Sequence, residues 1–130
     1  MRWYIDSSAI IKLIKFEPES KALVASLPQR LTTSQLARIE VIRTINTYST
    51  ELLADSYSVL TDIPMIPIDD AVVTVAQGLP AFITLRTLDS IHLASALTIK
   101  NEIEGIISYD KEMNKAAVAL GLKVLSPGMK

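Results

Sequence analysis

The feature that most constrains the fold is a regular alternation of short apolar segments with stretches of helical spacing. Each apolar segment has only four or five residues, and all but the last precede a stretch in which apolar side chains recur with helical spacing. The apolar segments are residues 2–5, 30–34, 65–68, 105–108 and 123–127. Since short apolar strands that alternate with helices are typical of parallel sheets, the sequence predicts an α/β fold: a short parallel sheet flanked by helices on both faces.

The spacing of apolar residues also predicts the helices. We expect helices over residues 7–16, 20–27, 35–48, 50–63, 69–78, 85–100 and 110–121. Gly78 and Gly121 are placed to end two of them, and Thr87 is a candidate N-cap for the helix that contains Asp89.

Length and composition fit one compact domain. The chain has 130 residues, of which 49% are hydrophobic, and neither a repeat nor a linker divides it, so we expect a single domain over residues 1–130. No apolar run reaches the roughly 20 residues that span a bilayer. Asp6, Lys12 and Lys15 interrupt any signal-peptide core near the N-terminus. A cytoplasmic protein without membrane association is the simplest expectation.

The composition also narrows the chemistry. The absence of cysteine excludes disulfides, thiolate zinc sites and cysteine nucleophiles, and a triad or histidine metal site would have to use the single His92. Carboxylates are therefore the favoured carriers of any catalysis. A formal net charge of −1 is not the basic footprint of a protein that binds nucleic acid by bulk charge. A nucleic-acid role would need local positive groups or metal ions.

Four of the fourteen acidic residues stand in unusual places. Asp6 and Asp110 follow predicted strands, Glu40 lies among apolar residues of a predicted helix, and Asp89 lies in the first turn of another. Each has a structural explanation. Asp6 and Asp110 can cap helices, Asp89 can interact favourably with a helix N-terminus, and Glu40 can pair with Arg43.

Taken together, the four acids favour a metal site. Ligands of open parallel sheets bind beyond the carboxyl ends of the strands, where Asp6, Asp89 and Asp110 are predicted to lie and which Glu40 can reach. Neighbouring carboxylates repel each other unless some are protonated or a cation lies between them. Mg²⁺ and Mn²⁺ prefer such oxygen ligands and can promote phosphodiester cleavage.

These acids lie within motifs that resemble a known family. The segments "YIDSSAIIKL", "ARIEV", "LRTLDSIHLASAL" and "IISYDKEMNKAAVALGLKVLSP" resemble the PIN-domain ribonucleases, in particular VapC-type toxins of toxin–antitoxin pairs. The likeness runs from Tyr4 to Pro127, with "YIDSSA" and "LDSIHLA" as its most specific pieces.

The resemblance implies a PIN fold and an endoribonuclease that depends on Mg²⁺ or Mn²⁺. The family's acidic quartet falls on Asp6, Glu40, Asp89 and Asp110, and Ser8 matches the hydroxyl that supports the first aspartate. The resemblance further implies a homodimer and a cognate antitoxin whose tail enters the active-site groove.

Some family members carry a further acid after the fourth position of the quartet. Here the nearby residues are Glu112 and Asn114, so their contribution to a second metal stays open.

Several residues near the acids are candidates for binding. Positively charged side chains could contact RNA phosphates or antitoxin carboxylates, or could be solvated or ion-paired; they are Arg86, Lys12, Arg43, Arg38 and Lys15.

Aromatic residues and the histidine also allow two interpretations. Tyr109 could stack on a base, whereas Trp3 and Tyr4 lie in a predicted strand and are expected to pack. His92 could share a metal with Asp89, but we expect a packed residue that makes one hydrogen bond.

Two other functions remain open. An aspartate-nucleophile phosphatase or phosphoacceptor could use Asp6, but Ser8 stands where a phosphatase of this kind needs its second acid. A phosphoacceptor needs its acidic pair near the first strand, whereas Asp69 and Asp70 lie in mid-chain. A PIN-like binding module without catalysis is the other alternative, and the presence of all four acids argues against it.

Overall fold

The computed structural model of the protein describes residues 1–130 and contains a five-stranded sheet. The strands are β1 (Arg2–Ile5), β2 (Leu31–Ser34), β3 (Met65–Ile66), β4 (Ile103–Ile107) and β5 (Lys123–Leu125). The helices are α1 (Ser7–Lys12), α2 (Ser20–Ala25), α3 (Gln35–Tyr48), α4 (Leu53–Thr61), α5 (Asp70–Gln77), α6 (Thr87–Thr98) and α7 (Lys111–Ala119). Two 3₁₀ turns complete the fold, η1 (Thr50–Leu52) and η2 (Lys100–Glu102). None of the helices combines the length and apolar character that a membrane crossing requires.

All neighbouring strands in the sheet are parallel, in the order β3-β2-β1-β4-β5. The chain therefore builds the sheet outward from β1 in one direction, through β2 and β3. It then crosses back and continues on the other side of β1 with β4 and β5. The direction of winding changes between β1 and β4, and the crevice at such a point is where open parallel sheets bind their ligands.

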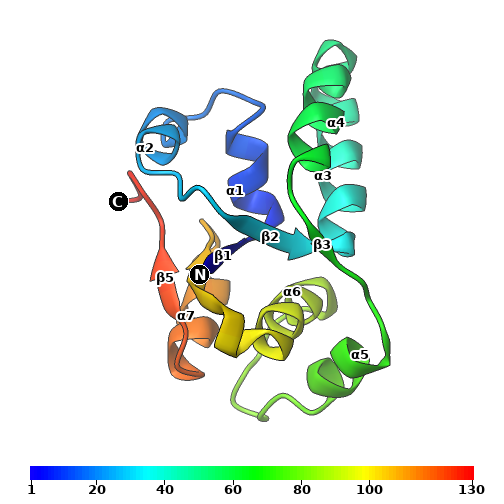
Figure 1. The fold of residues 1–130 in the computed structure, drawn as a ribbon, viewed down its shortest axis with the longest axis vertical. Helices are drawn as coiled ribbons and strands as arrows, with labels where there is room; N and C mark the ends of the chain where they lie inside the picture. Colours follow the sequence, from blue (N-terminus) through cyan, green and yellow to red (C-terminus); the bar gives the residue numbers. More distant parts are fainter.

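Helices cover both faces of the sheet, as the sequence predicts (Figure 1). One core cluster joins Ile5 and Ile107 to side chains from α1 to α4. The other joins Tyr4 and Ile106 to side chains from α6 and α7. The two clusters divide neighbouring strand residues between them because successive side chains of a strand point to opposite faces.

Several element boundaries differ from the predicted ones. Helix α1 ends at Lys12 rather than residue 16, because the chain turns back to place Glu17 and Glu19 on the Lys12 ammonium. The helix predicted for residues 50–63 begins as the turn η1. Strand β4 begins at Ile103, two residues early, where it pairs with β1.

The predicted N-cap of α6 is wrong. Arg86 has the extended backbone of the N-cap and makes no side-chain capping bond, so Thr87 is the first helical residue. Asp89 consequently lies in the third position of α6, where a carboxylate faces the positive end of the helix dipole. Gly121 follows the C-cap residue of α7, Leu120, and has a positive φ of 85°, which agrees with its predicted role in ending that helix.

Candidate active site

The candidate site lies at the carboxyl edge of the sheet, at the change of winding between β1 and β4. Helices α1, α3 and α7 begin at this edge because each follows directly from a parallel strand. Helix α6 precedes β4 and runs antiparallel to that strand. Its N-terminus therefore lies at the same edge, where β4 ends. The positive ends of four helix dipoles therefore favour negative charge here.

Asp6 is the most enclosed of the four acids, with only 4% of its surface exposed. It caps α1, and its Oδ1 accepts hydrogen bonds from the Ser8 hydroxyl at 2.6 Å and the Ala9 N–H at 3.1 Å. Burial raises the pKa of Asp6, although these hydrogen bonds and nearby His92 oppose the rise. Ser8 also accepts from the Tyr109 N–H at 3.0 Å, so it links Asp6 to the loop that leads to Asp110. Ser8 therefore makes the hydrogen bond to Asp6 that the resemblance implies.

Glu40 does not pair with Arg43; its partners are Ser7 and His92. Its Oε1 accepts from the Ser7 hydroxyl at 2.6 Å and lies 2.5 Å from Nε2 of His92. Burial alone would raise the pKa of Glu40, but hydrogen bonds from His92 and Ser7 outweigh it and leave the pKa below its usual value. Glu40 is therefore held as a carboxylate at neutral pH.

Asp110 and Asp89 lie at the starts of α7 and α6. Asp110 caps α7 by accepting from the Met113 N–H at 3.0 Å, as expected for this position. Burial raises the pKa of Asp89, and the charges of Asp110, Glu40 and Asp6 raise it further. All four acids are thus close enough to interact electrostatically. No three histidine or acidic side chains of the chain are gathered tightly enough to hold a metal ion by themselves.

His92 makes more contacts than the one predicted hydrogen bond. Its ring is buried, with Nδ1 2.6 Å from the Tyr4 hydroxyl and Nε2 within reach of both Glu40 and Ser7. Sequence reasoning predicted packing for Tyr4, which is confirmed, but missed its bond to His92. The position of His92 one turn after Asp89 places both side chains on one face of α6, but it gives no signal for a partner on β1.

The candidate binding residues divide into sequestered and accessible ones. Lys12 pairs with Glu17 and Glu19, and its ammonium lies 4.7 Å from the centre of the Tyr109 ring. The Tyr109 hydroxyl donates to the Pro127 carbonyl, so both residues are engaged within the protein.

Three of the candidate cations are exposed and form no ion pair within the chain: Arg38, Arg43 and Arg86. Lys15 instead lies over the ring of Tyr48 and pairs with Glu17.

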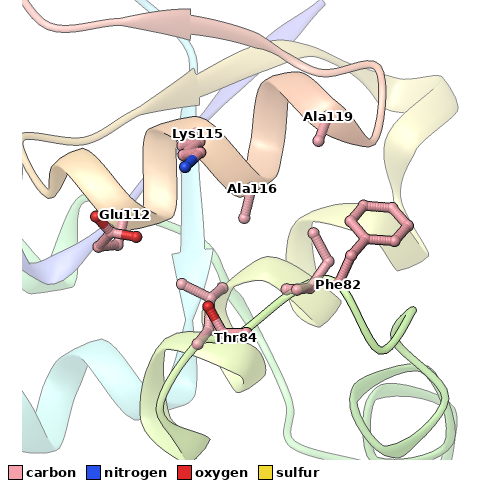
Figure 2. A pocket seen from close by; sticks show the side chains of 8 residues that line it. Phe82, Thr84, Glu112, Lys115, Ala116 and Ala119 are labelled. Carbon is pink, nitrogen blue, oxygen red and sulfur yellow. The ribbon is translucent and has the colours of Figure 1, made fainter.

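The residues that follow Asp110 have separate environments. Asn114 donates to the Ser108 carbonyl and the Ser126 hydroxyl, which fastens α7 to β5. Glu112 is exposed and lines a small hollow of about 100 Å³ between α7 and the segment that precedes α6. Figure 2 shows Glu112 and Lys115 on α7 opposite Thr84 and Phe82. None of the four acids lines this hollow.

Relatives match this chain over nearly its whole length and theirs. Residues 3–119 match the PIN domain family. Ribonuclease VapC46 of Mycobacterium tuberculosis is 39% identical over 126 residues, which cover 95% of this chain and 96% of the relative. Ribonuclease VapC35 of the same species is 37% identical over 131 residues, which cover 96% of each chain.

Several solved structures have the same fold as this chain. A chain of a toxin–antitoxin complex from Klebsiella pneumoniae has a TM-score of 0.76 at 19% identity, covering 98% of this chain and 99% of that one. VapC20 of M. tuberculosis, described as a toxin that cleaves the Sarcin-Ricin loop, has a TM-score of 0.76 at 15% identity, covering 98% and 100%. The predicted resemblance is confirmed, and this chain belongs to the PIN domain family.

Proposed function

We propose that this protein is an endoribonuclease dependent on Mg²⁺ or Mn²⁺ and acts as the toxin of a VapBC-type toxin–antitoxin pair. The observation that carries the proposal is the convergence of Asp6, Glu40, Asp89 and Asp110 on one edge of the sheet. Electrostatic repulsion already reaches Asp89 from the other three acids. Relatives named ribonucleases at 37–39% identity support the choice of RNA as the substrate.

The donor set fits a hard divalent cation. Only carboxylate oxygens are offered by the quartet, and Mg²⁺ in proteins is usually held by one or two carboxylates, with waters and substrate phosphates as the remaining ligands. A site of this kind does not need three protein ligands in contact beforehand. Asp6, Asp89 and Asp110 are the proposed metal ligands, together with Glu40. A bound divalent ion would help activate a water and stabilise the leaving oxygen of the phosphodiester.

The chain's own residues prepare this site for a polyanion. Ser8 and the Ala9 N–H hold Asp6 in place, and Ser7 and His92 hold Glu40 as a carboxylate. Arg86 precedes Asp89 by three residues and has no acidic partner, so it is the favoured contact for an RNA phosphate or an antitoxin carboxylate, with Arg43 as a second. Local cations of this kind reconcile RNA binding with a net charge of −1.

The partners are part of the same proposal. Structures of toxin–antitoxin complexes share this fold, which supports an antitoxin partner. We also propose a homodimer in the cytoplasm, where RNA and antitoxin are both available. Light scattering of the purified chain tests the dimer, and co-purification of a partner protein from the native cells tests the antitoxin.

The decisive experiment is an RNA cleavage assay with Mg²⁺ or Mn²⁺. Asp6→Asn, Glu40→Gln, Asp89→Asn and Asp110→Asn should each lower the rate by about 100-fold or more, the scale expected when a group that stabilises transition-state charge is removed. Asp70→Asn is the matched control, because Asp70 is also an acid in the first turn of a helix but lies on α5.

The same assay separates the alternatives. Full cleavage in two of the four quartet variants would contradict the proposal. Metal binding without cleavage of any RNA would favour a binding module, whereas stable labelling of Asp6 by acetyl phosphate would favour a phosphoacceptor.

A further inference from the structure

His92 is the point at which four elements of the fold meet. Its imidazole comes from the second turn of α6 and is only 3% exposed. Tyr4 of β1 approaches Nδ1, with its hydroxyl oxygen at 2.6 Å, while Glu40 of α3 approaches Nε2, with Oε1 at 2.5 Å. Ser7 of α1 contacts both Glu40 and His92: its hydroxyl oxygen lies 2.6 Å from Oε1 of Glu40 and 3.1 Å from Nε2 of His92.

The direction of these hydrogen bonds follows from the chemistry of the groups. A phenol is protonated at neutral pH and can donate to Nδ1 of a neutral imidazole. An imidazole that accepts at Nδ1 carries its proton on Nε2, and a charged imidazole carries protons on both nitrogens. Because a carboxylate can only accept, Nε2 of His92 carries a proton and donates to Oε1 of Glu40 in either state.

Both side-chain donors to Glu40 reach the same oxygen. Ser7 and His92 contact Oε1, and no protein group donates to Oε2. We propose that His92 is a positioning residue that, together with Ser7, fixes Oε1 of Glu40 so that Oε2 is the oxygen presented to the reaction. The inference rests on the proposed function only in giving Glu40 a role in cleavage.

The same imidazole also positions a second acid. Asp89 precedes His92 by three residues on α6, so the two side chains lie on one face of that helix. Because the imidazole is bonded to β1 and α3, it holds the start of α6 at the edge of the sheet. One buried ring thereby sets the separation between the helices that carry Glu40 and Asp89.

The hydrogen bond can be measured without metal or RNA. His92 is the only histidine in the chain, so its nitrogen resonances need no further assignment. We expect ¹⁵N NMR of the metal-free full chain to show a proton on Nε2, with its proton resonance shifted downfield. Glu40→Gln should move that resonance upfield. An unprotonated Nε2, or a resonance that Glu40→Gln leaves in place, would overturn the proposal.

Functional variants test the positioning role. Removing a partner that orients a metal ligand typically costs 10- to 100-fold in metal affinity or activity. His92→Leu should lower Mn²⁺ affinity or the cleavage rate by about this much, while His92→Gln, which keeps a donor, should lose less. Ser7→Ala should also lower the Mn²⁺ affinity or the cleavage rate. Ser56→Ala is the matched control, since Ser56 is a buried helical serine that bonds only to the Leu52 carbonyl.

The outcomes separate this inference from the proposed function. Wild-type Mn²⁺ affinity and cleavage in both His92→Leu and Ser7→Ala would overturn the positioning role. Equal losses in His92→Leu and His92→Gln that merely follow a lowered melting temperature would also overturn it. A wild-type chain that has the expected imidazole resonance but neither binds Mn²⁺ nor cleaves RNA would instead contradict the proposed function.

Discussion

At the scale of single residues, one carboxylate can serve both the fold and the site. Asp6 caps α1 through the Ala9 N–H and is also the most buried acid of the quartet. Asp110 does the same for α7. A cap explains why an acid is tolerated at each position, but both caps also place a carboxylate at the ligand-binding edge of the sheet. The structural and functional explanations of these residues are therefore compatible.

The raised pKa of Asp6 predicts a pH-dependent gain in stability for Asp6→Asn. Between the unfolded and folded pKa values the native protein binds more protons than the unfolded chain, so wild-type stability falls as pH rises through this window. Asparagine keeps the cap but does not ionise. The variant should therefore be more stable than the wild type at pH 7. Its free energy of unfolding should be higher by about 1.4 kcal/mol for each unit by which folding raises the pKa of Asp6.

Urea unfolding of both proteins from pH 3 to pH 8 measures this difference. The difference in the free energy of unfolding should shrink as the pH falls below the usual pKa of an aspartate side chain. A difference that is constant across the series would contradict the burial of an ionised Asp6.

Arg86 is the exposed cation whose removal should weaken binding. Loss of one phosphate contact lowers affinity for RNA of any sequence and reduces the salt dependence of binding by about one unit of slope. Arg86→Ala should show this in filter binding at several salt concentrations. Arg30→Ala is the control, because Arg30 precedes β2 and so lies at the opposite edge of the sheet. Unchanged affinity for both RNA and antitoxin would contradict the assignment.

At the scale of elements, the parallel strands pack so closely that one position in β4 excludes a side chain. A Cβ at Gly105 would lie 2.4 Å from the Lys123 carbonyl oxygen and 2.8 Å from the Trp3 ring. Both neighbours belong to strands that pair with β4, so neither can move without disturbing the sheet.

Gly105→Ala should therefore destabilise the protein by about 1–3 kcal/mol, the usual cost of overpacking. Thermal unfolding followed by circular dichroism measures the loss. Gly78→Ala serves as the control, since its φ is negative and the nearest atom would be 3.2 Å away. Equal effects of the two substitutions would show that β4 can shift to admit a methyl group.

At the scale of the whole molecule, a divalent ion should couple the separate helices of the site. A ligand that binds only the folded state stabilises it by mass action, by about 2.7 kcal/mol at 100 times its dissociation constant. Mn²⁺ should therefore raise the melting temperature of the wild type. The double variant Asp89→Asn/Asp110→Asn should lose most of this increase, because it lacks the carboxylates from α6 and α7. Equal increases in both proteins would place Mn²⁺ elsewhere.

The sequence by itself determined the α/β architecture, and it singled out Asp6, Glu40, Asp89 and Asp110 as the candidate acidic quartet. The alternation of strands with helices depends on local patterns. The apolar residues 2–5 predict a strand, and the apolar spacing after them predicts a helix, whichever segments pack against them. The parallel order then brings Asp6 and Asp110 to one edge. Boundaries were less predictable: α1 ends early because Glu17 and Glu19 draw the chain back to Lys12.

Only the tertiary structure decided which side chains hold the quartet. Arg43 is the near neighbour of Glu40 along α3. The hydrogen-bond partners of Glu40 instead lie 33 positions before it and 52 positions after it in the sequence. Likewise, Tyr4 and His92 are 88 positions apart but share a buried hydrogen bond. Hydrogen bonds act over about 3 Å. Contacts between distant segments therefore depend on how the helices pack across the sheet, which no local pattern of residues specifies.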